Sequence, residues 1–330
     1  MANSIRQIKN NKIAQMKKSL LIFGALGVLI IIACSNIKAD EKNNTVENNT
    51  TTEVASDMMI TKELSEDFKK YWYAGKAEIT SYTLEQARYG EIREGKAVLV
   101  YVTEDFLPKE QVKADYQNKD NVPVLKLNAT KKFNTGIYPY SIMQSTFYPV
   151  SDTKHAIKVS SSMQEWCGHV YAQINNRENY EIISHSYFQG EADQNFKLDK
   201  DILENELWTK IRINPENLPQ GDVKIIPSLE YCRLKHKEIK AYTAKTALKK
   251  ENDLSTYTID YPELKRKISF TFSSSFPYEI ESWTETFSSG FGPNAKELIT
   301  KATKLKSIKS AYWGKNSNRD EVLRDSLDLK

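Results

Sequence analysis

Ala97-Val98-Leu99-Val100-Tyr101-Val102 follows Gly95 and contains no charged residue. A short unbroken run of aliphatic and β-branched residues, introduced by a glycine, is typical of a strand that is covered on both faces. The run therefore predicts a central strand of a large sheet.

Segments with an alternating apolar pattern lie on both sides of this run. They include residues 77–82, 122–128, 137–148, 180–188, 256–260, 268–273 and 278–286. Short polar turns separate most of them, which favours antiparallel pairing, because parallel crossovers need a dozen or more residues each. A sheet of about ten strands or more must twist, curl or close. We therefore predict a mainly β (α+β) fold: a large, strongly curved, antiparallel sheet, open and half-barrel-like, with one or two helices on its concave face.

Helical spacing marks a few segments. Lys62 to Tyr73 has apolar residues on one face, and Thr61 or Ser65 could cap it. Residues 202–211 carry a second apolar stripe, with Pro215 just beyond. Other segments give weaker predictions: a strand at Leu229 to Leu234, a weak helix or ragged strand at Lys301 to Tyr312, and a closing helix at Asp320 to Leu327.

The N-terminal 33 residues have the pattern of an export signal. Met1 to Lys18 carries five basic residues and no acid, and a 15-residue apolar stretch then runs from Ser19 to Ala33. A basic start, an apolar core and a small residue at the exit are typical of a secretory signal peptide. The apolar stretch is shorter than the ~20 residues that a spanning helix needs.

Ile31-Ile32-Ala33-Cys34 resembles a bacterial lipobox, and the resemblance implies lipidation of Cys34 and cleavage before it. The alternative is an uncleaved N-terminal anchor. The predicted organisation is a lipoprotein signal peptide at 1–33, a disordered tether at 34–60 and a single β-rich domain at 61–330. The expected location is the bacterial cell envelope, lipid-anchored at the outer membrane on its periplasmic or surface side.

Cleavage would change the charge of the protein. The full chain has 47 basic and 43 acidic residues, and removal of the five basic residues in 1–33 leaves 42 against 43, a net charge of −1. This balance gives no support for nucleic acid as a partner. The compact basic cluster Lys265-Arg266-Lys267 precedes an apolar strand. It indicates either an anionic partner or a solvated strand end, and we favour the strand end.

Cys167 and Cys232 are the two cysteines after Cys34. In an exported protein such a pair indicates either a disulfide or two free thiols. Cys167 with His169, and Cys232 with His236, are alternative candidates for a metal site or a thiol nucleophile. Neither spacing is that of a standard zinc site, so we predict no metal and no cofactor.

The sequence lacks the common catalytic motifs, including GxSxG, the P-loop, HExxH and GxGxxG. The leading functional hypothesis is therefore a non-catalytic binding or carrier module for an apolar or amphipathic ligand, or for an envelope protein partner. The alternatives are an envelope hydrolase or metal-dependent enzyme that uses the Cys–His pairs, and a structural or assembly lipoprotein.

Residues 77–91, Val102–Phe106 and Asn128–Tyr140 resemble segments of an uncharacterised lipoprotein family of Bacteroidota, and the resemblance extends through the whole domain. Some members carry the automatic name "septum formation inhibitor Maf", which would imply a nucleotide pyrophosphatase. The Maf family has a serine-rich loop with paired arginines after its first strand, and this sequence has no such loop. Residues 268–283 resemble consecutive strands of half-barrel envelope proteins that carry or sense lipids.

Overall fold

The computed structural model describes residues 64–152 and 155–329. The predicted signal peptide, the tether and Cys34 lie outside these ranges. None of the helices within them has the length and apolarity that crossing a bilayer demands.

Sixteen strands form one open sheet in the described part of the chain. Residues 77–198 contribute β1 (Ala77–Arg88), β2 (Glu91–Leu107), β3 (Val112–Lys113), β4 (Val122–Thr135), β5 (Tyr138–Pro149), β6 (Lys158–Glu165), β7 (Gly168–Asn176), β8 (Tyr180–Ser186) and β9 (Gln194–Leu198). Residues 202–310 contribute β10 (Ile202–Leu203), β11 (Gly221–Ile226), β12 (Tyr242–Glu251), β13 (Leu254–Tyr261), β14 (Arg266–Ser273), β15 (Ile280–Ser289) and β16 (Lys296–Ser310).

The strand order joins these two sets of strands through β16 and β1. It runs β10-β11-β12-β13-β14-β15-β16-β1-β2-β4-β5-β6-β7-β8-β9, with β3 beside β2. All neighbours pair antiparallel except β10 and β11. The apolar run 97–102 lies in β2, near the middle of this order, as predicted. The prediction of a large open antiparallel sheet is confirmed.

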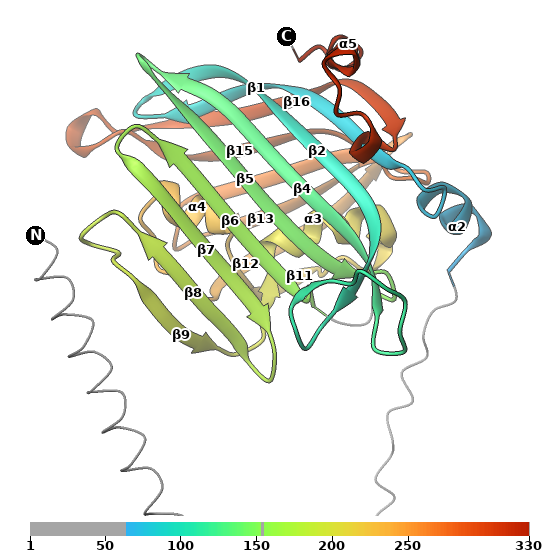
Figure 1. Cartoon of the computed structure of the whole chain (residues 1–330). Coiled ribbons are helices and arrows are strands. Elements are labelled where there is room, and N and C mark those ends of the chain that lie inside the picture. The colour runs from blue at the N-terminus through green and yellow to red at the C-terminus, as the bar shows by residue number, and fades with distance from the viewer. Residues whose placement is uncertain (1–63, 153–154, 330) are drawn as a thin grey trace, which may run out of the picture. The chain divides into compact units, whose positions relative to one another are not determined.

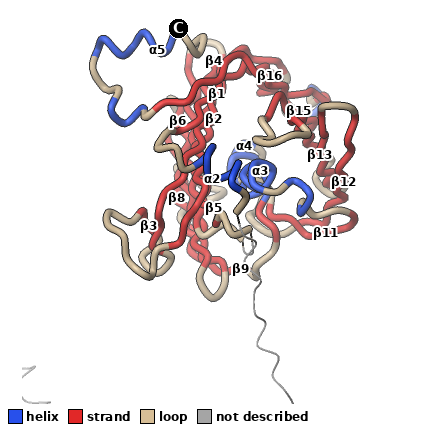
Figure 2. Tube along the Cα trace, turned by 90° about the vertical axis from the view of Figure 1, so that its right-hand side faces the viewer, coloured by secondary structure: helices blue, strands red, loops and turns tan. Residues whose placement is uncertain are grey.

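The sheet curves around two of the helices (Figures 1 and 2). Figure 2 shows α3 (Glu204–Ile213) and α4 (Leu229–Leu234) between its two halves, so helices do cover the concave face. Leu207 and Ile211 of α3 are buried in the main core. Trp208 makes edge contacts with Phe270 and Trp283, with ring centroids 4.7 and 5.0 Å apart.

The first described helix, α2 (Glu66–Trp72), begins after Ser65, whose hydroxyl accepts a hydrogen bond from the Phe68 amide. Ser65 is thus the cap, and not Thr61. The predicted helix at 202–211 is found as α3, although Ile202 and Leu203 form the short strand β10. Three 3₁₀ turns follow other elements: η1 (Pro215–Asn217), η2 (Gly292–Asn294) and η3 (Tyr312–Gly314).

One predicted element is wrong, and one ambiguous element is resolved by the structure. Leu229 to Leu234 is a helix and not a strand, because Ser228 caps it by accepting from the Tyr231 amide and Glu230 is held by groups from the sheet. The ambiguous segment 301–312 is mostly strand β16. The closing helix is the short α5 (Val322–Asp325), which follows the 3₁₀ turn η4 (Asn318–Glu321).

Candidate binding site

The turns of the sheet define two distinct ends. Because neighbouring strands are antiparallel, the connections β1–β2, β4–β5, β6–β7, β8–β9, β13–β14 and β15–β16 lie at one end, which we call the hairpin end. The start of β1 pairs with the end of β16 at the other end, where α2 lies, and we call this the α2 end. Figure 1 shows the hairpins and α2 on opposite sides.

A cleft of about 350 Å³ opens at the hairpin end. Its walls come from the β1–β2, β13–β14 and β15–β16 turns and from the residues that follow α4. The apolar part of the lining includes Tyr231, Leu234, Leu264, Phe287 and Phe291. Segments far apart in the sequence therefore meet in one concave surface.

The cleft is strongly basic. Arg88, Lys235, Lys237 and Lys265 all line it, and no Asp or Glu of the described residues does. His236 contributes a further nitrogen-bearing side chain, which contacts Glu191 outside the cleft at 2.7 Å from Nδ1. Four cations with no lining carboxylate create a positive potential that favours an anionic ligand.

Arg88 is fixed in place by its neighbours. Its guanidinium donates to the carbonyl oxygen of Leu234 at 2.7 Å and to the hydroxyls of Tyr89 and Tyr140 at 3.0 and 3.1 Å. The group also stacks 4.1 Å from the centre of the Tyr89 ring. Arg88 is only 8% exposed, and its Nε has no partner within the described residues. A buried cation held in this way is paired with dipoles and rings and not with a carboxylate.

Lys235 also lines the cleft, beside Leu234, whose carbonyl oxygen holds Arg88. Its Nζ donates to the Ser288 carbonyl oxygen at 2.6 Å and lies 5.0 Å from the centre of the Phe287 ring. Burial lowers the pKa of Lys235, and the charges of Arg88 and Lys237 lower it further. An anion bound here would relieve this repulsion.

Three non-glycine residues around the cleft have positive φ: Tyr89 at 54°, His236 at 50° and Lys265 at 47°. Side chains with a Cβ adopt this left-handed region at a cost of about 1 kcal/mol or more each. Such strained positions often occur at functional sites. All three of these residues line the cleft.

A small interior cavity adjoins the cleft. The two share Tyr231, Leu234, Lys235 and Phe287 in their walls. The cavity holds about 40 Å³, which is room for roughly three water molecules. It is too small for an acyl chain, so a large apolar ligand has no room inside it.

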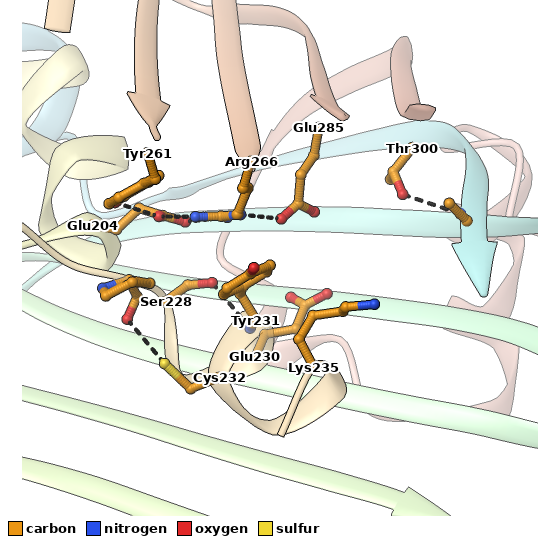
Figure 3. A network of polar contacts seen from close by, with 12 residues as sticks. Glu204, Ser228, Glu230, Tyr231, Cys232, Lys235, Tyr261, Arg266, Glu285 and Thr300 are labelled. Atoms are coloured by element: carbon orange, nitrogen blue, oxygen red, sulfur yellow. Dashed lines mark hydrogen bonds and ion pairs between the residues drawn. The ribbon is translucent and has the colours of Figure 1, made fainter. Parts of the chain in front are cut away.

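Buried ion pairs line this cavity (Figure 3). Arg266 donates to both oxygens of Glu204, with Nη2 2.8 Å from Oε1, and its Nε donates to Glu285 at 2.6 Å. Tyr261 also donates to Glu204, at 2.7 Å. Burial alone would raise the pKa of Glu204, but Arg266 outweighs it and the pKa is lowered. Arg266 thus faces two carboxylates, whereas none from the described residues lines the cleft.

A second buried pair positions α4. Lys131 of β4 donates to Glu230 at 2.7 Å, and Gln144 of β5 donates to its other oxygen at 2.9 Å. Gln144 in turn accepts from the Asn205 side chain at 2.9 Å. These bonds tie the first turn of α4 to the sheet, and the end of α4 then carries Lys235 into the cleft.

The two cysteines after Cys34 are both free in the described fold. Cys167 is exposed in the turn between β6 and β7, whereas Cys232 is buried in α4. Burial raises the pKa of Cys232 to about 12. A hydrogen bond with Glu165 raises the pKa of Cys167. Both shifts oppose thiolate formation and so disfavour a nucleophilic role.

Cys232 and His236 contact different partners. Cys232 Sγ lies near the backbone oxygens of Pro227 and Glu238, at 3.9 and 4.0 Å, while His236 contacts Glu191. Across residues 64–152 and 155–329, no group of three or more His, Cys, Asp and Glu side chains could hold a metal ion.

The cluster Lys265-Arg266-Lys267 is divided by the fold. Lys265 lines the cleft, Arg266 is buried against Glu204, and Lys267 is exposed. The prediction of a solvated strand end is therefore confirmed for the exposed Lys265 and Lys267 and wrong for Arg266, which is buried. The sequence features that could have indicated the cleft are this cluster and the Tyr89-Gly90 turn. The sequence alone does not show that they lie close together.

No protein-family model matches the chain, and no curated protein matches it in sequence. Among solved structures, a β-barrel-like protein of the domain of unknown function DUF1849 from Brucella abortus is similar. The TM-score is 0.42 at 9% identity, and the match covers 71% of this chain and 97% of that one.

Proposed function

We propose that this protein is a non-catalytic binding module of the bacterial cell envelope, anchored through lipid on Cys34, and that its cleft binds an amphipathic ligand with an anionic group. The basic N-terminus, the apolar stretch and the lipobox-like Ile31-Ile32-Ala33-Cys34 support the location. The cleft at the hairpin end supports the activity.

The observation that carries the proposal is the unbalanced charge of the cleft. Arg88, Lys235, Lys237 and Lys265 have no carboxylate beside them in the lining. Apolar side chains such as Leu264 and Phe287 adjoin these cations. A concave site of this size with apolar walls and a few convergent polar groups is typical of ligand binding. The anionic group would contact the cations while a short apolar part packs on the aromatic rings.

The ligand would be held in the open cleft and not inside the sheet. The interior cavity of about 40 Å³ cannot take an acyl chain. A carrier that encloses a whole lipid is therefore the less favoured form of the binding hypothesis. A long-chain ligand would keep its chain outside the cleft.

The proposal can be tested with a soluble anionic amphiphile. Isothermal titration of the chain beginning at Ser35, which keeps the whole sheet and its core, would use dihexanoyl-phosphatidylglycerol, with dihexanoyl-phosphatidylcholine as the neutral counterpart. We expect the anionic lipid to bind at least about tenfold more tightly, because its head group lacks a compensating cation.

The matched variants are K237E/K265E in the cleft and K119E/K249E at the α2 end, which make the same change in net charge. The cleft variant should lose most of the affinity, and the control should keep it. Equal binding of the two lipids, or equal loss in the two variants, would overturn the proposal.

A further inference from the structure

Large apolar side chains are exposed at the tips of four turns of the hairpin end. Ile137 is 82% exposed in the β4–β5 turn, Trp166 is 67% exposed in the β6–β7 turn, and Phe291 is 69% exposed after β15. Tyr187, after β8, is 68% exposed. Soluble proteins seldom place several such residues together without a partner surface.

Contacts between aromatic side chains link two of these tips, Phe291 and Trp166, through Tyr89, Tyr138 and the buried Tyr140, and we call this set the aromatic rim. Phe291 lies 5.8 Å from Tyr89, and the Tyr89 and Tyr140 hydroxyls are 2.9 Å apart. Tyr138 lies 6.0 Å from Tyr140 and 6.5 Å from Trp166. The distances are between ring centroids, except for the hydroxyl pair. The rim therefore crosses three separate turns of the sheet and the segment after β15.

Tyr187 extends the rim to the turn after β8. Its ring packs over Gly168, where an added Cβ would lie only 2.7 Å from Cγ of Tyr187. Gly168 also has a φ of 153°. The close approach of this ring to the backbone explains why glycine follows Trp166-Cys167 here.

The rim borders the basic cleft directly, because Tyr89 and Phe291 belong to both. Of the acids at this end, Glu191 pairs with Arg233 and His236, Glu165 accepts from the Cys167 amide and Glu238 pairs with Lys240, while Glu263 in the β13–β14 turn is exposed. Exposed aromatic tips beside uncompensated cations match the interface of an anionic bilayer in both polarity and charge.

We infer that the hairpin end docks on the surface of a bilayer that contains anionic lipids, with the aromatic rim in the interfacial layer and the cleft cations over the head groups. This rests on the proposed function and deepens it, because the membrane then supplies the ligand of the cleft. Aromatic side chains provide buried apolar area, and each nearby Lys or Arg adds electrostatic attraction, so the two parts reinforce each other.

Vesicle co-sedimentation tests the inference with the unlipidated chain from Ser35. The probes are vesicles of phosphatidylcholine alone and of phosphatidylcholine mixed with phosphatidylglycerol. We expect binding only to the mixed vesicles, and weaker binding at high salt because exposed charges are screened.

The rim variant is W166S/Y187S, whose two residues do not line the cleft, and its control is Y116S/W313S, which removes two exposed aromatic side chains from the α2 end. The rim variant should lose about tenfold or more in partition, and the control should not. Circular dichroism and unchanged binding of dihexanoyl-phosphatidylglycerol would show that the rim variant is folded with its cleft intact.

The outcomes separate docking from ligand binding. If the parent chain ignores mixed vesicles but binds the short-chain lipid, the docking inference fails and the proposed function stands. If the short-chain lipid does not bind while vesicles do, the proposed function fails and docking stands. If the rim variant binds vesicles as well as the parent does, docking by the rim is wrong. A rim-dependent dimer with no vesicle binding would show that a second copy is the partner, which also overturns the inference.

Discussion

Arg212 of α3 and Glu78 of β1 form a buried ion pair with two hydrogen bonds, of 2.6 and 2.7 Å, and both side chains are 1% exposed. The Arg212 guanidinium packs against the rings of Trp72 and Tyr101, and Tyr71 donates to the same carboxylate. At the other end of α3, Glu204 pairs with Arg266. The helix thus has an acid at its N-terminus and a base at its C-terminus, which suits its dipole.

Removal of one partner of this pair should be costly. Arg212→Met leaves Glu78 buried without its cation, and we expect a loss of about 3–5 kcal/mol in the free energy of unfolding. Urea denaturation measures it. The double variant E78Q/R212M should lose much less than the sum of the single variants, since no unpaired charge remains. Additive losses would contradict the strong coupling that the geometry predicts.

The buried carboxylates should also set the acid stability. Arg212 lowers the pKa of Glu78, and Arg266 lowers that of Glu204, against the opposing effect of burial. A lowered pKa in the folded state stabilises the fold above the unfolded value of about 4.3, and this contribution disappears as the pH falls through the folded value. As the pH is lowered from 7, the urea concentration at the unfolding midpoint should therefore begin to decrease below about pH 4. The decrease of the midpoint with pH should be shallower in E78Q/R212M. An identical decrease in both proteins would argue against Glu78 as a cause.

The thiols should differ sharply in reactivity. Cys167 is exposed, whereas burial raises the pKa of Cys232 to about 12. Alkylation of the native chain, mapped by mass spectrometry, should label Cys167 and spare Cys232 until urea unfolds the protein. Rapid native labelling of Cys232 would reopen the thiol-enzyme alternative. Recovery of a Cys167–Cys232 disulfide would show that the pair forms after all.

Anion binding in the cleft should depend on pH through Lys235. Burial, with Arg88 and Lys237, lowers the pKa of this ammonium, and its charged form is the one that an anion stabilises. As the pH rises, affinity for dihexanoyl-phosphatidylglycerol should fall, and the fall should begin below the ordinary lysine value of about 10.4. Titration calorimetry of the parent and of K235M would measure it. The same pH profile in both would assign the effect to another group.

Lys265 offers a test of whether the cleft is strained for binding. It has a φ of 47°, which glycine tolerates better. Lys265→Gly should therefore stabilise the fold by up to about 1 kcal/mol while weakening anion binding. Thermal unfolding and titration on the same sample would show both effects. If Lys265→Gly is less stable than the parent, or if it binds the anion with full affinity, the positive φ of Lys265 is not linked to anion binding.

Much of the fold could be predicted from local patterns. The run 97–102 and the alternating segments indicated a large antiparallel sheet, and Ser65 marked the start of α2. Leu229 to Leu234 was predicted incorrectly because six residues are too few to distinguish periods of two and of 3.6. The contacts of Glu230 with Lys131 and Gln144, which come from distant strands, favour the helix.

The candidate site was much harder to predict. Arg88, Lys235 and Lys265 each look like an ordinary turn residue, and nothing local in the sequence shows that three turns meet. Their proximity follows from the strand order, in which β14, β15, β16 and β1 are neighbours. The exposed tips Trp166 and Phe291 are likewise isolated aromatic residues until the fold brings their turns to one end.

The pairing of β1 with β16 places the earliest and latest strands of the described chain side by side, with Ala77 opposite Ser310. The middle of the sheet therefore cannot be completed until nearly the whole polypeptide has been synthesised. During synthesis, β1 would be paired with β2 alone until β16 has been made. The long segment between β1 and β16 must close into a loop before the sheet is complete. Loss of the C-terminal segment would therefore remove a strand from the centre of the sheet and not from its edge.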